Sequence, residues 1–428
     1  MFSGPGCSAA ATPAAFHLGL TGALLAVAAV AVQGQALPGA GSAPVRLASP
    51  VTHSDWMLRD PAPAWGPEGV RQILDRCREC GWTRVYWRCF DGGRALYPSR
   101  LLQPAHGYDE ENYHRDHGSE WVLAKLAPYD WGTYDALAEA VRYGHEIGIE
   151  VHAWLSINED DHGYGLISRF SREHPEWRWV RRDGGVFRSQ LSFAFPKVQE
   201  YKLALVAEIL SYHPDGIFFD WIRTGDVRDN PHTDQAGVAN YGYEAPNVAR
   251  FRERYGTDPL DVANADPRWV RVRARPQTEF MRRAHQLIRD HDPECAISAM
   301  VQNPWGYRGS PTDTPYDGNL RGLLLDVHAW AREGLMDEVV AAGYYREGGN
   351  AELATRALRE ETLGRASVWL FGWIASPEQF AADVALAERL GAPQLLLWES
   401  DYVRMPPADE ALVRAMREYA DGALSSAP

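Results

Sequence analysis

The chain alternates between short apolar runs, typical of buried strands, and longer amphipathic runs, typical of helices. Eight strand-like runs occur, and a helix-like run follows each one. This alternation predicts a parallel sheet covered by helices, and eight such units predict a (β/α)8 TIM barrel, which is an α/β fold. The expected strands are 51–57, 83–90, 150–158, 216–222, 296–303, 338–344, 367–374 and 394–399. The expected helices are 67–80, 134–147, 197–211, 275–290, 322–333, 351–363, 377–390 and 408–419.

The connections that follow several strands are long, whereas those that lead from a helix into a strand are short. The long ones are 91–131, 159–196, 223–266 and 304–320, and the short ones include 80–82 and 148–149. A barrel enzyme builds its active site on the loops at the C-terminal ends of the strands, so long βα loops over that face predict a site there. An open doubly wound sheet is the alternative, but the sequence lacks the glycine-rich phosphate-binding turn that would favour it.

One strand-like run, "EVHAWLSIN" at 150–158, indicates which side chains face which way. Side chains alternate between the two faces of a strand. The apolar set should therefore pack against helices, and it comprises Val151, Ala153, Leu155 and Ile157. The mixed set should point into the barrel, and it comprises His152, Trp154, Ser156 and Asn158, the last nearest the rim. A polar side chain inside a barrel needs a partner or a ligand.

Carboxylates gather where the expected strands end. Asp220 ends the run "GIFFD", and Glu399 ends "LLLWE" in the same manner. Glycoside hydrolysis needs two carboxylates across the scissile bond, one to protonate the leaving oxygen and one to attack or to activate water. We therefore predict Asp220 and Glu399 as the catalytic pair, with Glu347 or Asp91 as alternatives for the second acid. Asp220 as a structural acid that pairs with an arginine is the other interpretation.

Other residues near the strand ends are candidates to hold a sugar. Arginine can bind hydroxyl or carboxylate groups, and some of the 16 tryptophans can stack on sugar rings. The predicted substrate-binding residues are Arg88, Trp154, Asn158, Trp221, Arg223 and Trp373. The alternatives are ion pairs between the arginines and the rim acids, and ordinary packing of the tryptophans.

Composition and motifs bear on other function classes. The net charge of −14 argues against binding of a nucleic-acid backbone. His53, Asp55, His152 and Glu399 could meet in a barrel mouth, but residues 53–55 do not form the His-x-His of amidohydrolase-type barrels. The sequence has no G-x-S-x-G elbow. We therefore expect no metal and no cofactor, and a metal-dependent hydrolase is a minor alternative.

The N-terminus has the features of an export signal. Residues 18–32 form an apolar stretch that is short for a membrane span and suitable for a signal core, with small residues before a cleavage point after Ala36. We expect a signal peptide at 1–36, a linker at 37–47 and the barrel at 48–425, in a secreted or periplasmic protein. An uncleaved N-terminal anchor is the alternative. Cys77, Cys80 and Cys89 could include a disulfide pair or could be buried free thiols, and the sequence does not decide between these alternatives.

Four stretches together resemble the bacterial glycosyl hydrolase-like 10 family. They are "EVHAWLSIN", "EHPEW", "FPKVQEYKLALVAEIL" and "HPDGIFFDWIR". The residues that match the family pattern are His152, Trp154, Asn158, Pro196, Asp215, Gly216, Ile217 and Asp220. The chain departs from the pattern in two places: the spacing from Trp154 to Asn158 is one residue longer than in the family, and residues 221–225 differ from the family's stretch after the aspartate. The resemblance covers roughly 67–300. It implies a glycosidase-type (β/α)8 domain in an exported protein that acts on a bacterial or environmental glycan.

The leading hypothesis is therefore an exported glycoside hydrolase that cleaves O-glycosidic bonds of a poly- or oligosaccharide. The expected partner is a carbohydrate, with no nucleic acid and no membrane apart from a signal anchor. A non-catalytic carbohydrate-binding barrel is the competing interpretation, because it would keep the aromatic residues without needing paired acids. The sequence leaves open the glycan, the linkage, and whether the anomeric configuration is retained or inverted.

Overall fold

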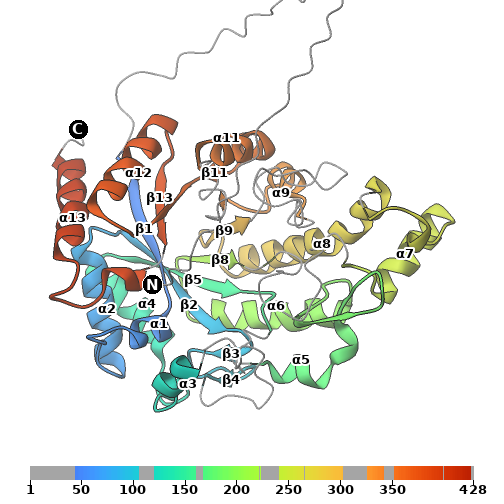
Figure 1. Cartoon of the computed structure of the whole chain (residues 1–428), viewed down its shortest axis with the longest axis horizontal. Helices are drawn as coiled ribbons and strands as arrows, with labels where there is room; N and C mark the ends of the chain where they lie inside the picture. Colours follow the sequence, from blue (N-terminus) through green and yellow to red (C-terminus); the bar gives the residue numbers. More distant parts are fainter. Residues whose placement is uncertain are drawn as a thin grey trace, which may run out of the picture. The chain divides into compact units, whose positions relative to one another are not determined.

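The computed structural model describes residues 44–105, 120–160, 167–220, 222, 241–264, 266–301, 325–341, 351–398 and 400–425. Nine parallel strands run in the order β11, β10, β9, β8, β5, β2, β1, β13, β12 (Figure 1). β11 (Ser367–Val368) and β12 (Leu370–Trp373) are successive parts of one segment. The first part pairs with β10 and the second with β13. This segment therefore joins the two ends of the sheet, and the predicted eight-unit barrel is confirmed.

The remaining barrel strands lie where the sequence predicted them, with one exception described below. They are β1 (Arg46–Val51), β2 (Arg84–Asp91), β5 (Glu150–Ser156), β8 (Gly216–Asp220), β9 (Ala296–Val301), β10 (Glu338–Ala341) and β13 (Gln394–Trp398). The main surrounding helices are α2 (Pro67–Glu79), α4 (Ala136–Ile147), α6 (Pro196–Leu210), α8 (Pro267–His291), α9 (Val327–Glu333), α11 (Ala351–Thr362), α12 (Pro377–Leu390) and α13 (Glu410–Ser425). Smaller elements are α1 (His53–Leu58), β3 (Arg94–Ala95), β4 (Gln103–Pro104), α3 (Glu120–Leu126), α5 (Arg169–Glu173), β6 (Arg178–Val180), β7 (Val186–Leu191) and α7 (Ala245–Tyr255).

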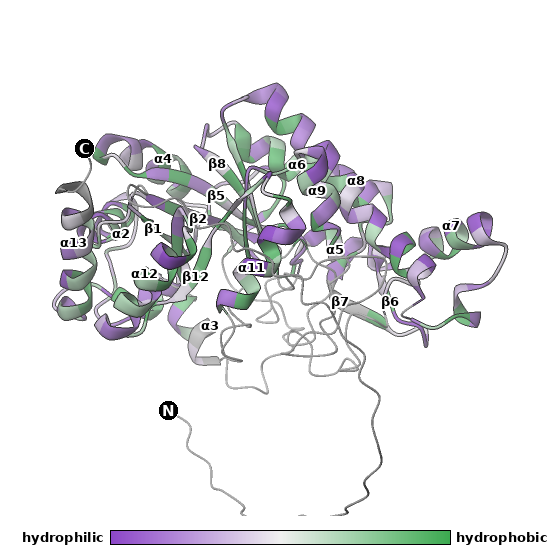
Figure 2. Cartoon of the chain, turned by 90° about the horizontal axis from the view of Figure 1, so that it is seen from above, coloured by the Kyte–Doolittle hydropathy of each residue, from purple (hydrophilic) through white to green (hydrophobic). Residues whose placement is uncertain are grey.

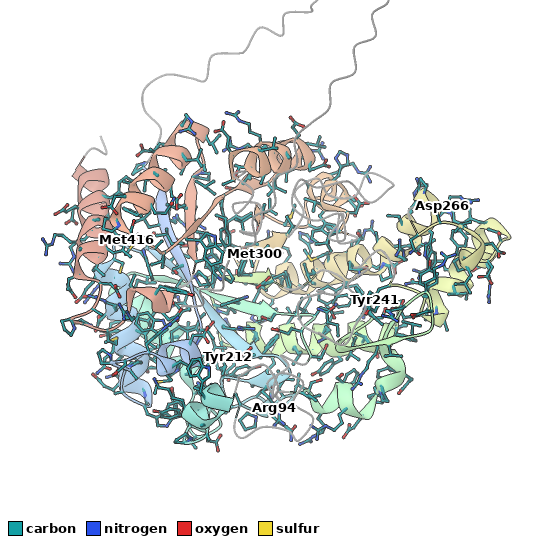
Figure 3. The ribbon with its side chains drawn as sticks, viewed as in Figure 1. Arg94, Tyr212, Tyr241, Asp266, Met300 and Met416 are labelled. Atoms are coloured by element: carbon teal, nitrogen blue, oxygen red, sulfur yellow. The ribbon has the colours of Figure 1, made fainter. Side chains whose placement is uncertain are left out.

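The barrel interior is a packed layer of large side chains, with contributions from every strand of the ring. It comprises Ala48, Tyr86, Trp154, Phe218, Met300, Val340, Trp369, Phe371 and Leu396, of which Met300 is labelled in Figure 3. Below this layer the interior is polar. Arg84 donates to Glu150 and Glu338 at 2.7 and 2.8 Å. These partly buried ion pairs lie at the N-terminal end of the barrel.

A larger apolar core lies between the strands and the helices. The outward set of β5 belongs to it, comprising Val151, Ala153, Leu155 and Ile157. Trp154 belongs to the interior layer instead. The predicted division of faces along this strand is therefore confirmed. Helices α4, α6 and α13 carry both hydrophilic and hydrophobic residues in Figure 2, as expected for helices that cover a sheet on one side.

The start of the barrel differs from the prediction. The first strand is Arg46–Val51, whereas residues 53–58, expected to be strand, form α1. Residues 46 and 47 of the expected linker therefore belong to β1. Ala48 and Ser49, which precede the predicted first strand, have a tertiary role, because Ala48 faces the interior beside bulky neighbours and Ser49 donates to Leu397 O at 2.6 Å.

A glycine fixes the packing at the start of β8. A Cβ on Gly216 would lie 2.3 Å from Nδ1 of His152 and 2.8 Å from the carbonyl of Ala296. His152 is 1% exposed, and Glu150 lies 3.5 Å from its Nε2. Burial lowers the pKa of His152 to about 4, so this histidine is a neutral interior residue at pH 7. The close approach explains why glycine precedes the apolar run that ends in Asp220.

The four described cysteines, Cys77, Cys80, Cys89 and Cys295, are buried free thiols. The disulfide considered for the first three is therefore wrong, and burial is the outcome. Within the described ranges, no helix combines the length and apolarity needed to cross a membrane. The expected signal peptide at 1–36 lies outside the described residues.

Candidate functional site

Asp220 is the last residue of β8 and is 1% exposed. It lies two residues after Phe218, which belongs to the interior layer, so its side chain is on the inner face of the barrel. The indole Nε1 of Trp154, on neighbouring β5, donates to Oδ2 of Asp220 at 3.2 Å. The prediction that Asp220 ends a strand is confirmed, and the structure adds that it lies on the inner face, where barrel enzymes carry reactive groups.

Arg88 gathers the rim carboxylates into one electrostatic cluster. Its Nη2 lies 2.7 Å from Glu159 and 2.9 Å from Asp91. Burial alone would lower the pKa of the Arg88 guanidinium, but nearby carboxylates raise it above its ordinary value. In decreasing order these are Asp91, Glu159, Asp55 and Asp220. The structure thus brings together Arg88 and Asp220, and the ion pairs considered for Arg88 are present.

Aromatic side chains continue from Asp220 across the barrel mouth. Arg88 lies over the Trp154 ring at 4.8 Å, and Trp154 meets Trp398 edge to face at 5.2 Å between centroids. Trp398 stacks on Phe371 at 5.6 Å, and Phe371 contacts Trp373 at 5.5 Å. Trp154 is buried, whereas Trp373 and Trp398 are partly exposed. The mouth therefore offers aromatic surface beside a buried carboxylate.

Two buried ion pairs hold the segment that follows β5. Glu159, 2% exposed, is fixed by Arg88 from β2. Asp160 accepts from Lys202 of α6 at 2.8 Å by each oxygen, and both side chains are 2% exposed. Burial lowers the pKa of Lys202, against the raising effect of Asp160. These two acids are therefore anchored at the rim by buried cations.

Asn158 is fully buried in this anchored segment. The predicted residues Trp221, Arg223 and Glu399, with the alternative acid Glu347, lie outside the described residues. Their assigned roles remain predictions. Sequence reasoning missed Lys202, although its place in the amphipathic run of α6, among apolar neighbours, was a signal that a buried cation needed a carboxylate.

The metal alternative involved His53, Asp55, His152 and Glu399, of which Glu399 lies outside the described residues. In the structure His53 lies 3.1 Å from the Tyr134 hydroxyl, and burial lowers the pKa of His53 to about 3. His152 packs edge to face against Tyr86. Over the ranges that the structure describes, no group of three or more His, Cys, Asp or Glu side chains is arranged to hold a metal ion.

Comparison with protein families decides the relationship. The model of the glycosyl hydrolase-like 10 family matches residues 67–362, which is more than half of the chain. The chain belongs to the glycosyl hydrolase-like 10 family. The resemblance inferred from the four sequence stretches is thereby confirmed. A comparison with curated protein sequences gave no significant match.

Solved structures with a similar fold include three glycosidases. A β-galactosidase from Marinomonas ef1 is 13% identical with a TM-score of 0.56, over 88% of this chain and 59% of the galactosidase. The catalytic domain of a β-amylase from Paenibacillus polymyxa is 10% identical with a TM-score of 0.53, over 89% of this chain and 100% of that domain. An endo-1,4-β-mannanase from Rhizomucor miehei is 10% identical with a TM-score of 0.52, over 91% of this chain and 97% of the mannanase. At these identities the likeness establishes the barrel fold alone.

Proposed function

We propose that this protein is an exported glycoside hydrolase that cleaves O-glycosidic bonds of a poly- or oligosaccharide. The observation that carries the proposal is Asp220, a buried carboxylate on the inner barrel face at the end of β8, in contact with Trp154. Membership of the family and the glycosidase-type fold support the same reaction class. The apolar stretch at 18–32 supports export.

Asp220 is the ionised member of the pair in this proposal. Hydrogen bonding by the Trp154 indole and attraction to Arg88 both favour a charged carboxylate. Asp220 would attack the anomeric carbon or take a proton from the attacking water, while the other acid protonates the leaving oxygen. Glu399 is our candidate for that acid, because it directly follows Trp398, the last residue of β13, and β13 lies across the barrel from β8 in the strand order. Trp373 and Trp398 would stack on the sugar.

The test is hydrolysis of a glycan panel by the wild type and by Asp220→Asn, with Asp215→Asn as the matched control. Asp215 precedes the other end of β8 and accepts from Val151 N at 2.7 Å, so it has no access to the barrel mouth. We expect Asp220→Asn to lose about 10²–10⁴-fold in rate while folded, as for removal of an acid–base group. Asp215→Asn should retain its turnover once its folding is verified by circular dichroism.

Equal turnover by the wild type and Asp220→Asn would remove Asp220 from the chemistry. Binding of a glycan without product from the wild type would replace the hydrolase with the carbohydrate-binding barrel. If the wild type releases product, the anomeric form of the first product, observed by NMR, distinguishes retention from inversion.

A further inference from the structure

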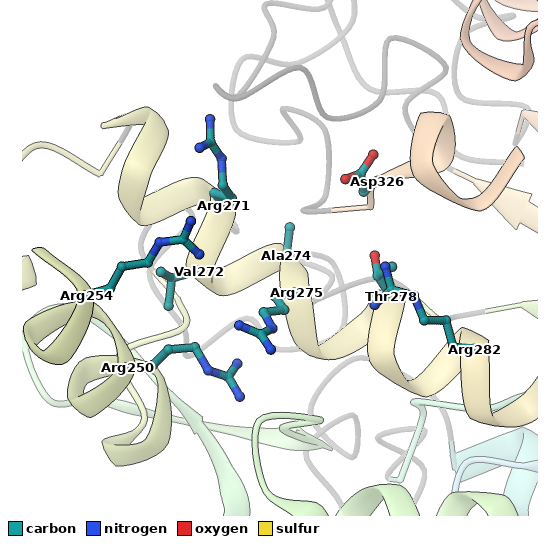
Figure 4. Close-up of a pocket in the computed structure, with 9 residues that line it drawn as sticks. All are labelled: Arg250, Arg254, Arg271, Val272, Ala274, Arg275, Thr278, Arg282 and Asp326. Carbon is teal, nitrogen blue, oxygen red and sulfur yellow. The ribbon is translucent and has the colours of Figure 1, made fainter. Parts of the chain in front are cut away.

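A pocket lies between α7 and α8, beside Asp326, the residue that precedes α9. Figure 4 shows it in close-up. Its volume is about 340 Å³. The lining residues include five arginines, Arg250, Arg254, Arg271, Arg275 and Arg282. Asp326 is the one acid among the lining residues, and we call this hollow the arginine pocket.

The charge of the arginine pocket is opposite to that of the whole chain, which carries −14. Glu279 accepts from Nε of Arg275 at 2.5 Å and lies 3.7 Å from Arg250. Glu333 accepts from Nε of Arg282 at 2.6 Å. Among the described residues, Arg250 and Arg275 thus share Glu279, and Arg282 pairs with Glu333. The described lining of the pocket is nevertheless mainly basic, which favours an anion.

Two of the guanidinium groups retain donors for a ligand. Among the residues that the structure describes, Arg254 forms no ion pair, and its recorded contact is with the ring of Tyr255. Nη1 of Arg250 is buried and has no hydrogen-bond partner there. Figure 4 shows the guanidinium groups of Arg250 and Arg275 extending toward one another across the space between the helices. Glu279 already contacts both of these groups, so a ligand anion would use the donors that remain on Arg250 and Arg254.

Packing beneath the pocket holds the two helices in place. Phe251 of α7 and Trp269 of α8 are fully buried and meet edge to face at 5.3 Å. Val272 belongs to the same apolar cluster and also lines the pocket. The arginines therefore project from a rigid helix pair.

The pocket lies on the side of the barrel that carries Asp220. α8 follows β8 and leads into β9, so its first residue lies toward the C-terminal ends of the strands. The later part of α8, with Phe280 and Ile288, packs on the barrel core. The earlier part packs on α7, which lies beyond the start of α8 in both views (Figures 1 and 2). A glycan that extends from the barrel mouth could therefore reach this pocket.

We propose that the arginine pocket binds an anionic group, a carboxylate, sulfate or phosphate, carried by an acidic glycan. This inference rests on the proposed function, because it assigns a remote subsite to the glycan cleaved at the barrel mouth. Guanidinium groups bind such oxyanions by paired hydrogen bonds. The volume is at the lower end of the range for ligand sites, which suits one charged sugar unit.

The test measures binding by the inactive Asp220→Asn protein, so that it does not depend on turnover. The charged probes are hexagalacturonate, a heparin hexasaccharide and inorganic phosphate. The neutral probes are methyl-esterified hexagalacturonate and a desulfated, carboxyl-reduced heparin hexasaccharide. Titration calorimetry at low salt compares Asp220→Asn alone with its combination with Arg254→Glu. The matched control combination carries Arg414→Glu, an exposed arginine on α13, which makes the same change in net charge.

We expect at least one charged oligosaccharide to bind about tenfold or more tightly than its neutral form, the size of one charge-assisted contact. Arg254→Glu should remove that advantage, and Arg414→Glu should keep it. Equal binding of all charged and neutral probes, or an equal loss in both variants, would overturn the proposal. Phosphate that binds as tightly as the charged oligosaccharides would assign the pocket to a free anion and overturn the glycan assignment.

The outcome is separable from that of the proposed function. Charge-selective binding with no hydrolysis by the wild type would retain the arginine pocket and reject the hydrolase. Hydrolysis by the wild type that is unchanged by Arg254→Glu, with no charge-selective binding, would retain the hydrolase and reject the pocket.

Discussion

The buried carboxyl group of Glu244 should make the free energy of unfolding depend on pH. Glu244 is the N-cap residue of α7 and is 1% exposed. Its carboxylate accepts from Val180 N and from Nδ2 of Asn247, each at 3.2 Å. Burial nevertheless raises the pKa of Glu244 to about 7 from its ordinary value of 4.5. At pH 8 the folded protein must therefore hold a buried negative charge at this position.

The sign and size of the effect follow from the two pKa values. The folded protein holds the proton more tightly than the unfolded chain, so this contribution is complete below pH 4.5 and is lost as the pH rises through about 7. Each pKa unit corresponds to about 1.4 kcal/mol, so the free energy of unfolding loses about 3 kcal/mol from this residue between pH 4.5 and pH 8. Glutamine cannot ionise, so Glu244→Gln should lack this loss.

The measurement is urea denaturation of the wild type and Glu244→Gln at pH 4.5 and pH 8. The free-energy difference between the two proteins should move by about 3 kcal/mol in favour of the variant at the higher pH. Glu418→Gln, an exposed change on α13, should leave the pH dependence as in the wild type. A difference for Glu244→Gln that stays within about 1 kcal/mol at both pH values would refute the reasoning.

Two further predictions concern the barrel. Gly216→Ala places a methyl group 2.3 Å from Nδ1 of His152, so we expect the unfolding free energy to fall by about 1–3 kcal/mol. The control is Gly422→Ala, which should cause no such loss because the added methyl group meets no neighbour within 4 Å. Lys202→Met leaves Asp160 as a buried, unpaired carboxylate and should cost about 3–5 kcal/mol. Adding Asp160→Asn should recover much of that cost in the same denaturation assay, and no recovery would contradict the ion-pair explanation.

Local pattern was sufficient for much of the barrel. The alternation in "EVHAWLSIN" correctly divided core-facing from interior residues, because a strand exposes successive side chains to opposite faces whatever surrounds it. The run "GIFFD" placed Asp220 at a strand end because a short apolar run that stops at a charged residue is typical of a buried strand. The prediction of the first strand was wrong because residues 48–50 are small or proline, and their place in the barrel depends on the bulky side chains around Ala48.

The sequence by itself determined the eight-unit barrel and the place of Asp220 at a strand end. The barrel follows from the alternation of strand-like and helix-like runs, and the strand end follows from the apolar run before Asp220. Only the tertiary structure decided which groups meet, because pairing depends on residues far apart along the chain. The Trp154–Asp220 hydrogen bond spans 66 residues and the Lys202–Asp160 pair spans 42. The burial of Glu244 and the gathering of arginines between α7 and α8 likewise arise only when separate segments pack together.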